Sequence, residues 1–166
     1  MKPKLLFAPL TAAIAAGAFA ALPAQGAGDD LSWDYLNDRN YMTLTLRHTD
    51  PKAPLPFLAA CEDRGDVKIT LGAPLDKVKA AGESVTITLE SAGKTAAISG
   101  KAVFNQFTKV MELAVETKTD NPVFSLLTTG QPVKLTSPAR SDTVWPAPDV
   151  ERAHVWINDC TTRSEH

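Results

Sequence analysis

Short runs in which apolar and polar residues alternate recur along most of this chain. In the segment 41–48, Met42, Leu44 and Leu46 alternate with polar residues. Such alternation is typical of a β-strand with one buried face and one face toward solvent. The continuous apolar run 57–61 predicts a central strand instead, because both of its faces would be buried. Three further strands are predicted by alternation, with the core-facing residues Val67, Ile69 and Leu71, then Val85, Ile87 and Leu89, and then Met111, Leu113 and Val115.

Turn-forming residues separate these runs. In "EDRGD", residues 62–66, Gly65 can supply the positive φ that a tight hairpin turn needs. Three prolines within 50–56 predict a loop, a short strand is expected around Trp33, and Gly100 predicts a β-bulge. Since no long helical segment separates these strands, we expect seven or eight of them in a mainly β fold. The expected architecture is an antiparallel β-sandwich or a barrel-like sheet.

Two short helices are expected near the C-terminus. Asn121 is a favourable N-cap, Pro122 suits the first helical position, and Gly130 suits the position just past the end. Asp149 is a favourable N-cap for the last helix. The apolar residues expected to face the core are Val123, Leu126 and Leu127 in the first helix, Val133, Leu135 and Val144 in the hairpin that follows, and Val150, Ala153, Ile157 and Cys160 in the last helix.

The first residues predict export. Two lysines, an apolar alanine-rich stretch and small residues before an acidic pair have the order of a secretory signal peptide. We expect cleavage after Gly26, with Ala27 as a near alternative, so that residues 1–26 are the signal peptide. Residues 27–166 then form a single exported β domain, periplasmic or secreted, without stable membrane insertion after cleavage.

The charge balance argues against two classes of partner. The chain has 17 Lys+Arg and 19 Asp+Glu, and removal of Lys2 and Lys4 leaves 15 against 19, a net charge near −4. A weakly acidic domain is a poor match for nucleic acid or for an anionic membrane surface. We therefore expect no nucleic-acid partner.

The only two cysteines are Cys61 and Cys160. In an exported chain they most simply form a disulfide with each other. Closing a loop of about 100 residues would stabilise the fold by on the order of 4–5 kcal/mol. The alternative, a reactive thiolate, is disfavoured because Cys61 lies beside acidic residues and Cys160 lies near a helix C-terminus.

The sequence offers little catalytic chemistry. His48, His154 and His166 are not in metal-ligand spacing, and no nucleophile elbow, phosphate-binding loop or dinucleotide-binding glycine motif follows a strand. We interpret His48 as a surface residue and His154 as a partly buried structural one. The clustered acids of 62–66 are interpreted as solvated turn residues. No catalytic, cofactor or metal site is expected.

A binding surface is the remaining candidate site, with Trp33, Arg64, Asp66 and Trp145 as its possible residues. Arg64–Asp66 spells "RGD", an integrin-binding tripeptide in some extracellular proteins, but glycine and aspartate are also favoured in turns. Exposed tryptophans often anchor partners. Core or rim packing is the more common role for Trp33, Trp145 and Trp156.

Several segments together form a recognisable outline. They are Trp33, "FLAAC", "DVKITL", "NPVFSLLTTGQPVKLTSP" and a terminal helix ending in Cys160. It resembles small exported proteins of proteobacteria, many of them uncharacterised, and is similar to the invasion-associated locus B type. The resemblance implies a β-sandwich-like periplasmic domain with no known activity, and it supplies no catalytic residues.

We therefore expect a non-enzymatic exported protein that binds another protein or an envelope component, because loops on a rigid scaffold commonly carry recognition. One specific form is an inhibitor or immunity protein against a lysozyme, protease or toxin. The rival class is a small-ligand carrier or an enzyme with an unrecognised site. A deep pocket lined by His48 or His154 with a buried carboxylate would favour that rival. A structural envelope component is a third possibility.

Overall fold

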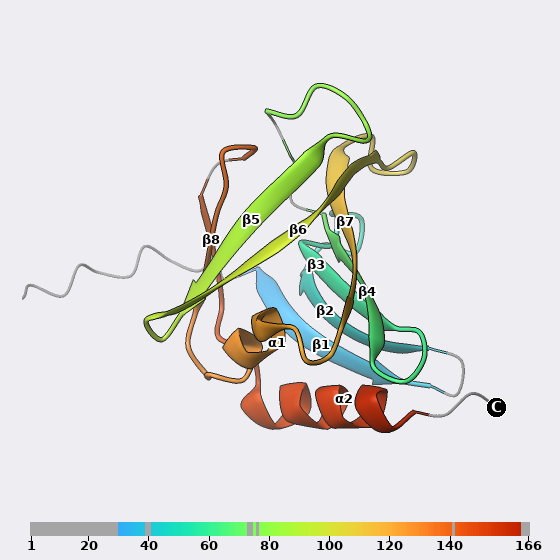
Figure 1. The fold of residues 1–166 in the computed structure, drawn as a ribbon, viewed down its shortest axis with the longest axis vertical. Helices are drawn as coiled ribbons and strands as arrows, with labels where there is room; N and C mark the ends of the chain where they lie inside the picture. The colour runs from blue at the N-terminus through green and yellow to red at the C-terminus, as the bar shows by residue number, and fades with distance from the viewer. Residues whose placement is uncertain (1–29, 39–40, 73–74, 76, 141, 164–166) are drawn as a thin grey trace, which may run out of the picture.

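The computed structural model describes residues 30–38, 41–72, 75, 77–140 and 142–163. Within them the chain forms nine strands and two helices (Figure 1). In chain order these are β1 (Leu31–Asn37), β2 (Met42–His48), β3 (Phe57–Cys61), β4 (Asp66–Leu71), β5 (Ser84–Ser91), β6 (Lys94–Phe104), β7 (Met111–Lys118), α1 (Pro122–Leu127), β8 (Val133–Thr136), β9 (Thr143–Trp145) and α2 (Val150–Thr162). The expected signal peptide, 1–26, lies outside the described residues.

All nine strands belong to one antiparallel sheet in the order β1-β2-β3-β4-β7-β6-β5-β8-β9. The sheet curls into a nearly closed barrel, so the mainly β, antiparallel, barrel-like fold is confirmed, with one strand more than expected. The long strand β6 makes the curl possible, because its residues 94–101 pair with β5 and its residues 101–104 pair with β7. Among the described residues, no helix is both long enough and apolar enough to cross a membrane.

Gly100 lies where β6 turns from β5 toward β7. Its pairing with Val85 is part of an uninterrupted register, so the expected β-bulge is wrong. A Cβ atom at Gly100 would instead collide with the carbonyl oxygen of Ala114 on β7. The position needs glycine for a close approach of two backbones rather than for a bulge.

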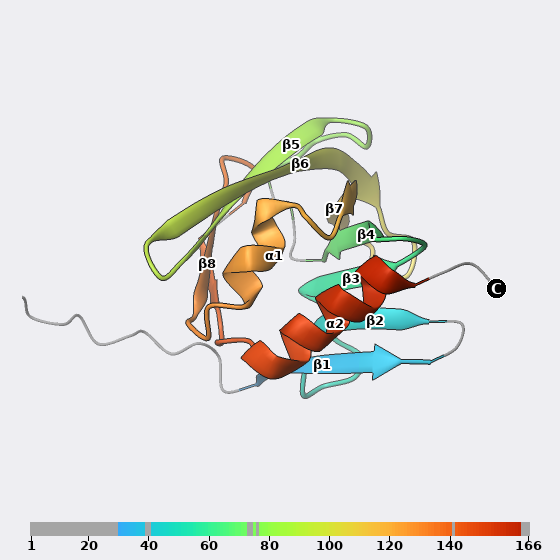
Figure 2. The same cartoon turned by 60° about the horizontal axis from the view of Figure 1, so that its bottom comes forward.

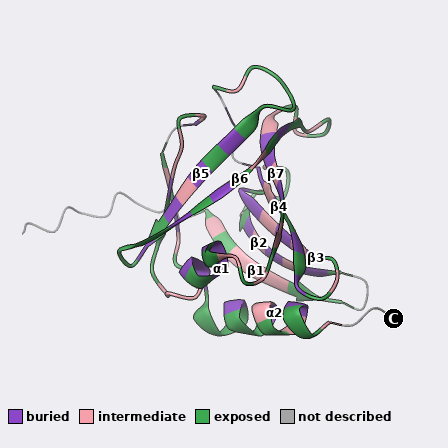
Figure 3. Cartoon of the chain, in the orientation of Figure 1, coloured by how far each residue is buried: buried purple, intermediate pink, exposed green. Residues whose placement is uncertain are grey.

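The predicted alternation is confirmed in β2, β4 and β5, and Figure 3 shows buried and exposed residues alternating along β5. The hairpin β8–β9 departs from it, because Val144 is 40% exposed. Val144 pairs with Lys134, whereas Trp145 pairs with the buried Val133. Directly paired residues lie on the same face of a sheet. The expected inward position of Val144 is therefore wrong, and Trp145 is the inward residue of β9.

The two helices lie together across one end of the barrel (Figure 2). Both predicted N-caps are confirmed: the Asn121 side chain accepts a hydrogen bond from the Val123 amide, and Asp149 accepts one from the Arg152 amide. The rings of Phe124 on α1 and Trp156 on α2 are 5.6 Å apart. On α2 the buried residues are Ala153, Trp156 and Cys160. Val150 is 37% exposed, so its expected core position is wrong.

The predicted disulfide is confirmed. Cys61 at the end of β3 is bonded to Cys160 on α2, with 5.7 Å between their Cα atoms and a sequence separation of 99 residues. The turn between β3 and β4 is hydrogen-bonded to the same helix, because the Gly65 amide donates a hydrogen bond of 2.9 Å to the Cys160 carbonyl. Gly65 has the expected positive φ, 81°. The C-terminal end of α2 is thus fixed to the β3–β4 hairpin by covalent and backbone links.

Candidate functional site

The barrel is completed by side chains where β1 meets the end of β9, a junction that we call the seam. Trp33 on β1 donates its indole N–H to the Pro146 carbonyl at 2.9 Å. The ring of Trp33 also lies 6.0 Å from that of Trp145, edge to face, and 5.6 Å from that of Phe57. Phe57 and Trp145 are themselves 5.6 Å apart. Three mutually packed aromatic rings and one hydrogen bond therefore hold the seam together.

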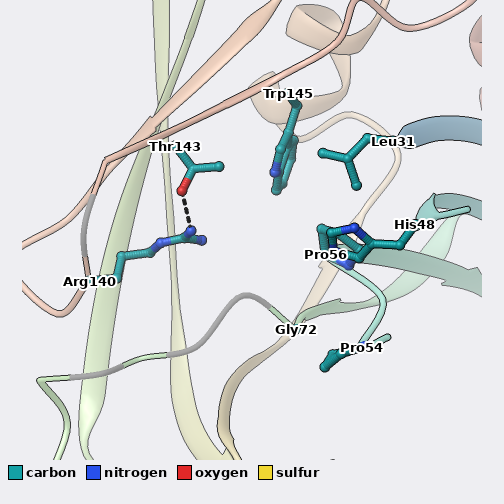
Figure 4. Close-up of a pocket in the computed structure, with 8 residues that line it drawn as sticks. All are labelled: Leu31, His48, Pro54, Pro56, Gly72, Arg140, Thr143 and Trp145. Carbon is teal, nitrogen blue, oxygen red and sulfur yellow. Dashed lines mark hydrogen bonds between the residues drawn. The ribbon is translucent and has the colours of Figure 1, made fainter. Parts of the chain in front are cut away.

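A cavity of about 330 Å³ opens beside this aromatic cluster (Figure 4). Most of its lining comes from strand ends and loops: the first residue of β1, the last of β2, the β2–β3 loop, the residue after β4 and the β8–β9 hairpin. The opposite ends of β3 and β4 are those that meet the disulfide and α2. We call it the seam cavity, and its lining residues are Leu31, His48, Pro54, Pro56, Gly72, Arg140, Thr143 and Trp145.

Most of the lining is apolar, but one wall carries a cation. Arg140 is only 5% exposed, and its Nη2 donates a hydrogen bond of 2.6 Å to the Thr143 hydroxyl. Figure 4 shows this pair on one side of the cavity, facing Leu31, His48 and Pro56 on the other. A guanidinium stays protonated in proteins, so this wall carries a permanent positive charge.

The loop that carries Arg140 is held by hydrogen bonds at several points. Ser137 donates its hydroxyl to the Thr86 carbonyl at 2.8 Å and accepts from the Ala139 amide at 3.2 Å. The Ala139 carbonyl in turn accepts from the Lys77 amide at 3.1 Å. These bonds fix the backbone on the N-terminal side of Arg140, and the Thr143 hydroxyl fixes its guanidinium.

His48 lies at the rim of the seam cavity and is paired with a carboxylate. Its Nδ1 is 2.9 Å from Asp30 Oδ2, and since a carboxylate only accepts, Nδ1 is the donor. This hydrogen bond holds the pKa of Asp30 below its usual value. The two conditions expected of a ligand or enzyme site are therefore met in part: the cavity is lined by His48, but the partner carboxylate is exposed.

The four residues expected to form a binding surface lie in two places. Trp33 is half-buried at the seam, and Trp145 is buried where it lines the seam cavity, so both take part in the packing that was given as the more common role for these tryptophans. Arg64 and Asp66 are exposed at the turn beside the disulfide. Asp66 forms a 3.0 Å ion pair with Lys118 on β7.

Two further expectations concern histidine and metal chemistry. His154 is exposed on α2, so its expected partly buried position is wrong; Trp156, two residues further on, occupies the buried face. Within the residues described, no group of His, Cys, Asp and Glu side chains is arranged to hold a metal ion.

Sequence reasoning missed the importance of Arg140 and Phe107. Arg140 belongs to "SPARSD", which has the composition of a solvated loop, and its burial depends on contacts from distant strands. Phe107 lies between β6 and β7 and is 97% exposed. Its backbone is ordered by Asn105, whose Oδ1 accepts from the Phe107 and Thr108 amides at 2.8 and 3.2 Å.

The Phe107 loop rests on a buried acid. Glu112 on β7 is among the few charged residues that are buried. The Asn105 side-chain amide donates to both of its carboxylate oxygens, at 2.9 and 3.0 Å, and the Thr108 hydroxyl donates to Oε1 at 3.2 Å. The loop thus presents an exposed aromatic ring from a framework that is internally hydrogen-bonded.

No family model, no curated protein and no solved structure matches this chain. The resemblance to small exported proteobacterial proteins therefore stays a prediction.

Proposed function

We propose that this chain is an exported, non-enzymatic binding domain that holds a small ligand with an apolar body in the seam cavity. The observation that carries the proposal is the combination of an apolar cavity of about 330 Å³ with the nearly buried Arg140 in its wall. Ligand sites are typically concave and mostly apolar, with a few polar groups that set orientation, and barrel mouths are a common place for them.

The size of the cavity limits the ligand. If each non-hydrogen atom takes about the 30 Å³ that a water molecule occupies in the liquid, the cavity holds roughly 11 such atoms. That is the size of a small metabolite or a short acyl chain rather than of a folded protein. The ring of Trp145, which lines the cavity, would contact the apolar part of such a molecule.

Binding without catalysis is favoured by the arrangement of the polar groups. A nucleophilic hydroxyl needs a neighbouring base to take its proton. The Thr143 hydroxyl instead receives a hydrogen bond from Arg140, a group that cannot accept a proton. The proposal of an exported protein is supported by the sequence of 1–26 and by the Cys61–Cys160 disulfide, since such bonds persist in oxidising compartments.

A fluorescence titration with N-phenylnaphthylamine, an uncharged apolar dye, tests this proposal. We expect saturable binding of one dye per chain to the wild type and at least about a tenfold loss of affinity in Leu31→Trp, which fills the cavity from its rim. Val155→Trp, on the exposed face of α2, is the matched control and should bind like the wild type. The proposal would be contradicted if the wild-type protein bound no dye, or if the Leu31→Trp variant bound the dye as tightly as the wild type does.

The Phe107 loop favours a second candidate, an inhibitor or immunity protein against a lysozyme, protease or toxin, or a binder of another envelope protein. Exposed aromatic side chains on pre-ordered loops are common anchors, because little conformational entropy is lost on binding. Purified protein is assayed against a panel of lysozymes and secreted proteases, with Phe107→Ala and Leu36→Ala compared. Inhibition lost only in Phe107→Ala supports this candidate, and a wild type that inhibits none of them counts against it.

A further inference from the structure

One polar group in the lining of the seam cavity has no partner within the chain. Trp145 is fully buried, and its indole N–H meets no hydrogen-bond acceptor among the described residues. A buried donor without an acceptor is costly, and native structures contain few of them. Figure 4 shows the ring of Trp145 between Thr143 and Leu31, with the ring nitrogen on the edge turned toward Thr143. The unpartnered donor therefore borders the space that a bound molecule would fill.

The place of this donor matters, because Trp156 also has an unpartnered indole N–H. Trp156 is fully buried on α2 against the ring of Phe124, and it is not among the residues that line the seam cavity. Its N–H therefore points to no ligand. At Trp145 an unsatisfied donor and a cavity occur together, and this coincidence is what points to a ligand there.

Thr143 supplies a second donor to the same space. Thr143 and Trp145 are two residues apart on β9, and alternate residues of a strand lie on the same face of a sheet. The Thr143 hydroxyl accepts its hydrogen bond from Arg140, so its own hydrogen is not used in that bond. The cavity therefore offers an indole N–H and a hydroxyl to one small molecule.

The remaining lining favours an uncharged ligand. Leu31, Pro54 and Pro56 present hydrocarbon surface to the cavity. A charged group that leaves water for such surroundings is unfavourable unless it is paired. Arg140 is already engaged within the chain, through the Thr143 hydroxyl and a further contact, so it does not call for an anion from outside. A carbonyl oxygen has two lone pairs and no charge, and it therefore matches two donors.

We infer that the seam cavity binds an uncharged carbonyl compound with an apolar body of the size of acetophenone, its oxygen accepting a hydrogen bond from Trp145 Nε1, with the Thr143 hydroxyl as the second donor. This inference rests on the proposed function, because it assigns the chemistry of the ligand to the same cavity. Acetophenone is smaller than the limit of roughly 11 non-hydrogen atoms that follows from the cavity volume. Its aromatic ring also suits the ring of Trp145, because aromatic groups pack favourably in edge-to-face or offset contacts.

The test compares acetophenone with α-methylstyrene, which has the same shape but carries a methylene group in place of the carbonyl oxygen. Affinities are measured by displacement of bound N-phenylnaphthylamine, and the ratio of the two affinities is compared between variants, because the two compounds differ in hydration. We expect Trp145→Phe to lower this preference for acetophenone at least about fivefold relative to the wild type. Trp156→Phe, which removes the other unpartnered indole N–H, is the matched control and should leave the ratio unchanged.

The indole N–H signals in the nuclear magnetic resonance spectrum supply a readout that needs no change in the cavity. The chain has three tryptophans, so the signal that persists in both Trp33→Phe and Trp156→Phe belongs to Trp145. In the wild type this signal should move downfield when acetophenone is bound and stay when α-methylstyrene is bound, because a hydrogen bond deshields the proton.

Benzoate, which carries a carboxylate in place of the acetyl group, should displace the dye less well than acetophenone does. Tighter binding of benzoate, an unmoved Trp145 signal with acetophenone bound, or an equal affinity ratio in the wild type and Trp145→Phe overturns the inference. The proposed function still stands in these cases, because the dye has bound. Wild-type protein that fails to bind the dye overturns both. If Trp145→Phe does not fold, the Trp145 signal of the wild type decides the matter.

Discussion

Trp33 and Pro146 are 113 residues apart in sequence, yet the indole N–H of one donates to the carbonyl of the other at 2.9 Å. The two residues belong to opposite ends of the sheet order, β1 and the segment just after β9. A side-chain hydrogen bond therefore takes the place of a strand pairing at this point. It also holds the aromatic cluster that lies beside the seam cavity.

The Trp33→Phe variant tests this closure. The substitution keeps an aromatic ring against Phe57 and Trp145 but removes the donor, so the Pro146 carbonyl loses its partner. We expect a loss of about 1 kcal/mol in the free energy of unfolding, measured by urea denaturation. Tyr41→Phe, which alters an exposed ring, should change the stability little. Equal stability of both variants would mean that the seam hydrogen bond contributes nothing measurable.

The disulfide should contribute a larger amount. Replacement of Cys61 and Cys160 together by alanine removes the constraint on the unfolded chain, and we expect a loss of about 4–5 kcal/mol for a loop of this length. Denaturation with and without a thiol reductant measures it. The reductant should destabilise the wild type and leave the double variant unchanged. A reductant effect of similar size on both would show that it acts elsewhere.

The Asn105→Ala variant should destabilise the protein by about 1–3 kcal/mol, because the buried Glu112 carboxylate loses two hydrogen bonds from the Asn105 amide. Gln106→Ala, at the exposed neighbouring position, is the control. In the background of Glu112→Gln the cost of Asn105→Ala should be smaller, since no buried charge is then left without its donors. Additive effects in this double-mutant cycle would contradict the proposed coupling.

The phenol of Tyr35 should titrate above its usual range. Burial raises the pKa of Tyr35, and its hydrogen bond of 3.0 Å to Asp159 raises the pKa further. Because the raised pKa belongs to the folded state, this contribution to stability is present below the unfolded pKa of about 10. It is lost as the pH rises through the higher folded value.

Tyrosinate absorbance in a Tyr41→Phe background follows the titration of Tyr35 alone, since the chain has two tyrosines. Asp159→Asn should lower the pKa of Tyr35, because the negative charge that opposes ionisation is gone. An unchanged titration curve in Asp159→Asn would assign the whole shift to burial. Asp149→Asn at the start of α2 provides the control for removing a carboxylate from the same helix.

Much of the fold follows from local patterns in the sequence. Strand faces with strict alternation, such as Met42, Leu44 and Leu46, could be assigned because a slip of one residue would expose the entire apolar set. The caps Asn121 and Asp149 could be assigned because their side chains bond to amides within three residues. These features depend on neighbours in sequence, which the sequence displays directly.

Features that depend on distant partners could not be assigned. Val144 and Trp145 are adjacent and both apolar, so alternation alone does not decide which of them faces inward; their pairing with Lys134 and Val133 does. The seam cavity is assembled from five separate segments, and its cation, Arg140, comes from a loop of polar composition. Nothing local to that loop signals that its arginine is buried.

The strand β9 is three residues long and has a hydrogen-bonded neighbour, β8, on one side of the sheet order. Short strands with a single neighbour tend to be the least protected part of a structure, whereas the cross-linked β3–β4 hairpin and α2 lie at the other extreme. A ligand of the proposed kind could therefore enter and leave by transient loosening of this one margin, with the disulfide intact. The molecule thus combines a covalently fixed end, at the disulfide, with an end at the seam where local opening is expected to begin.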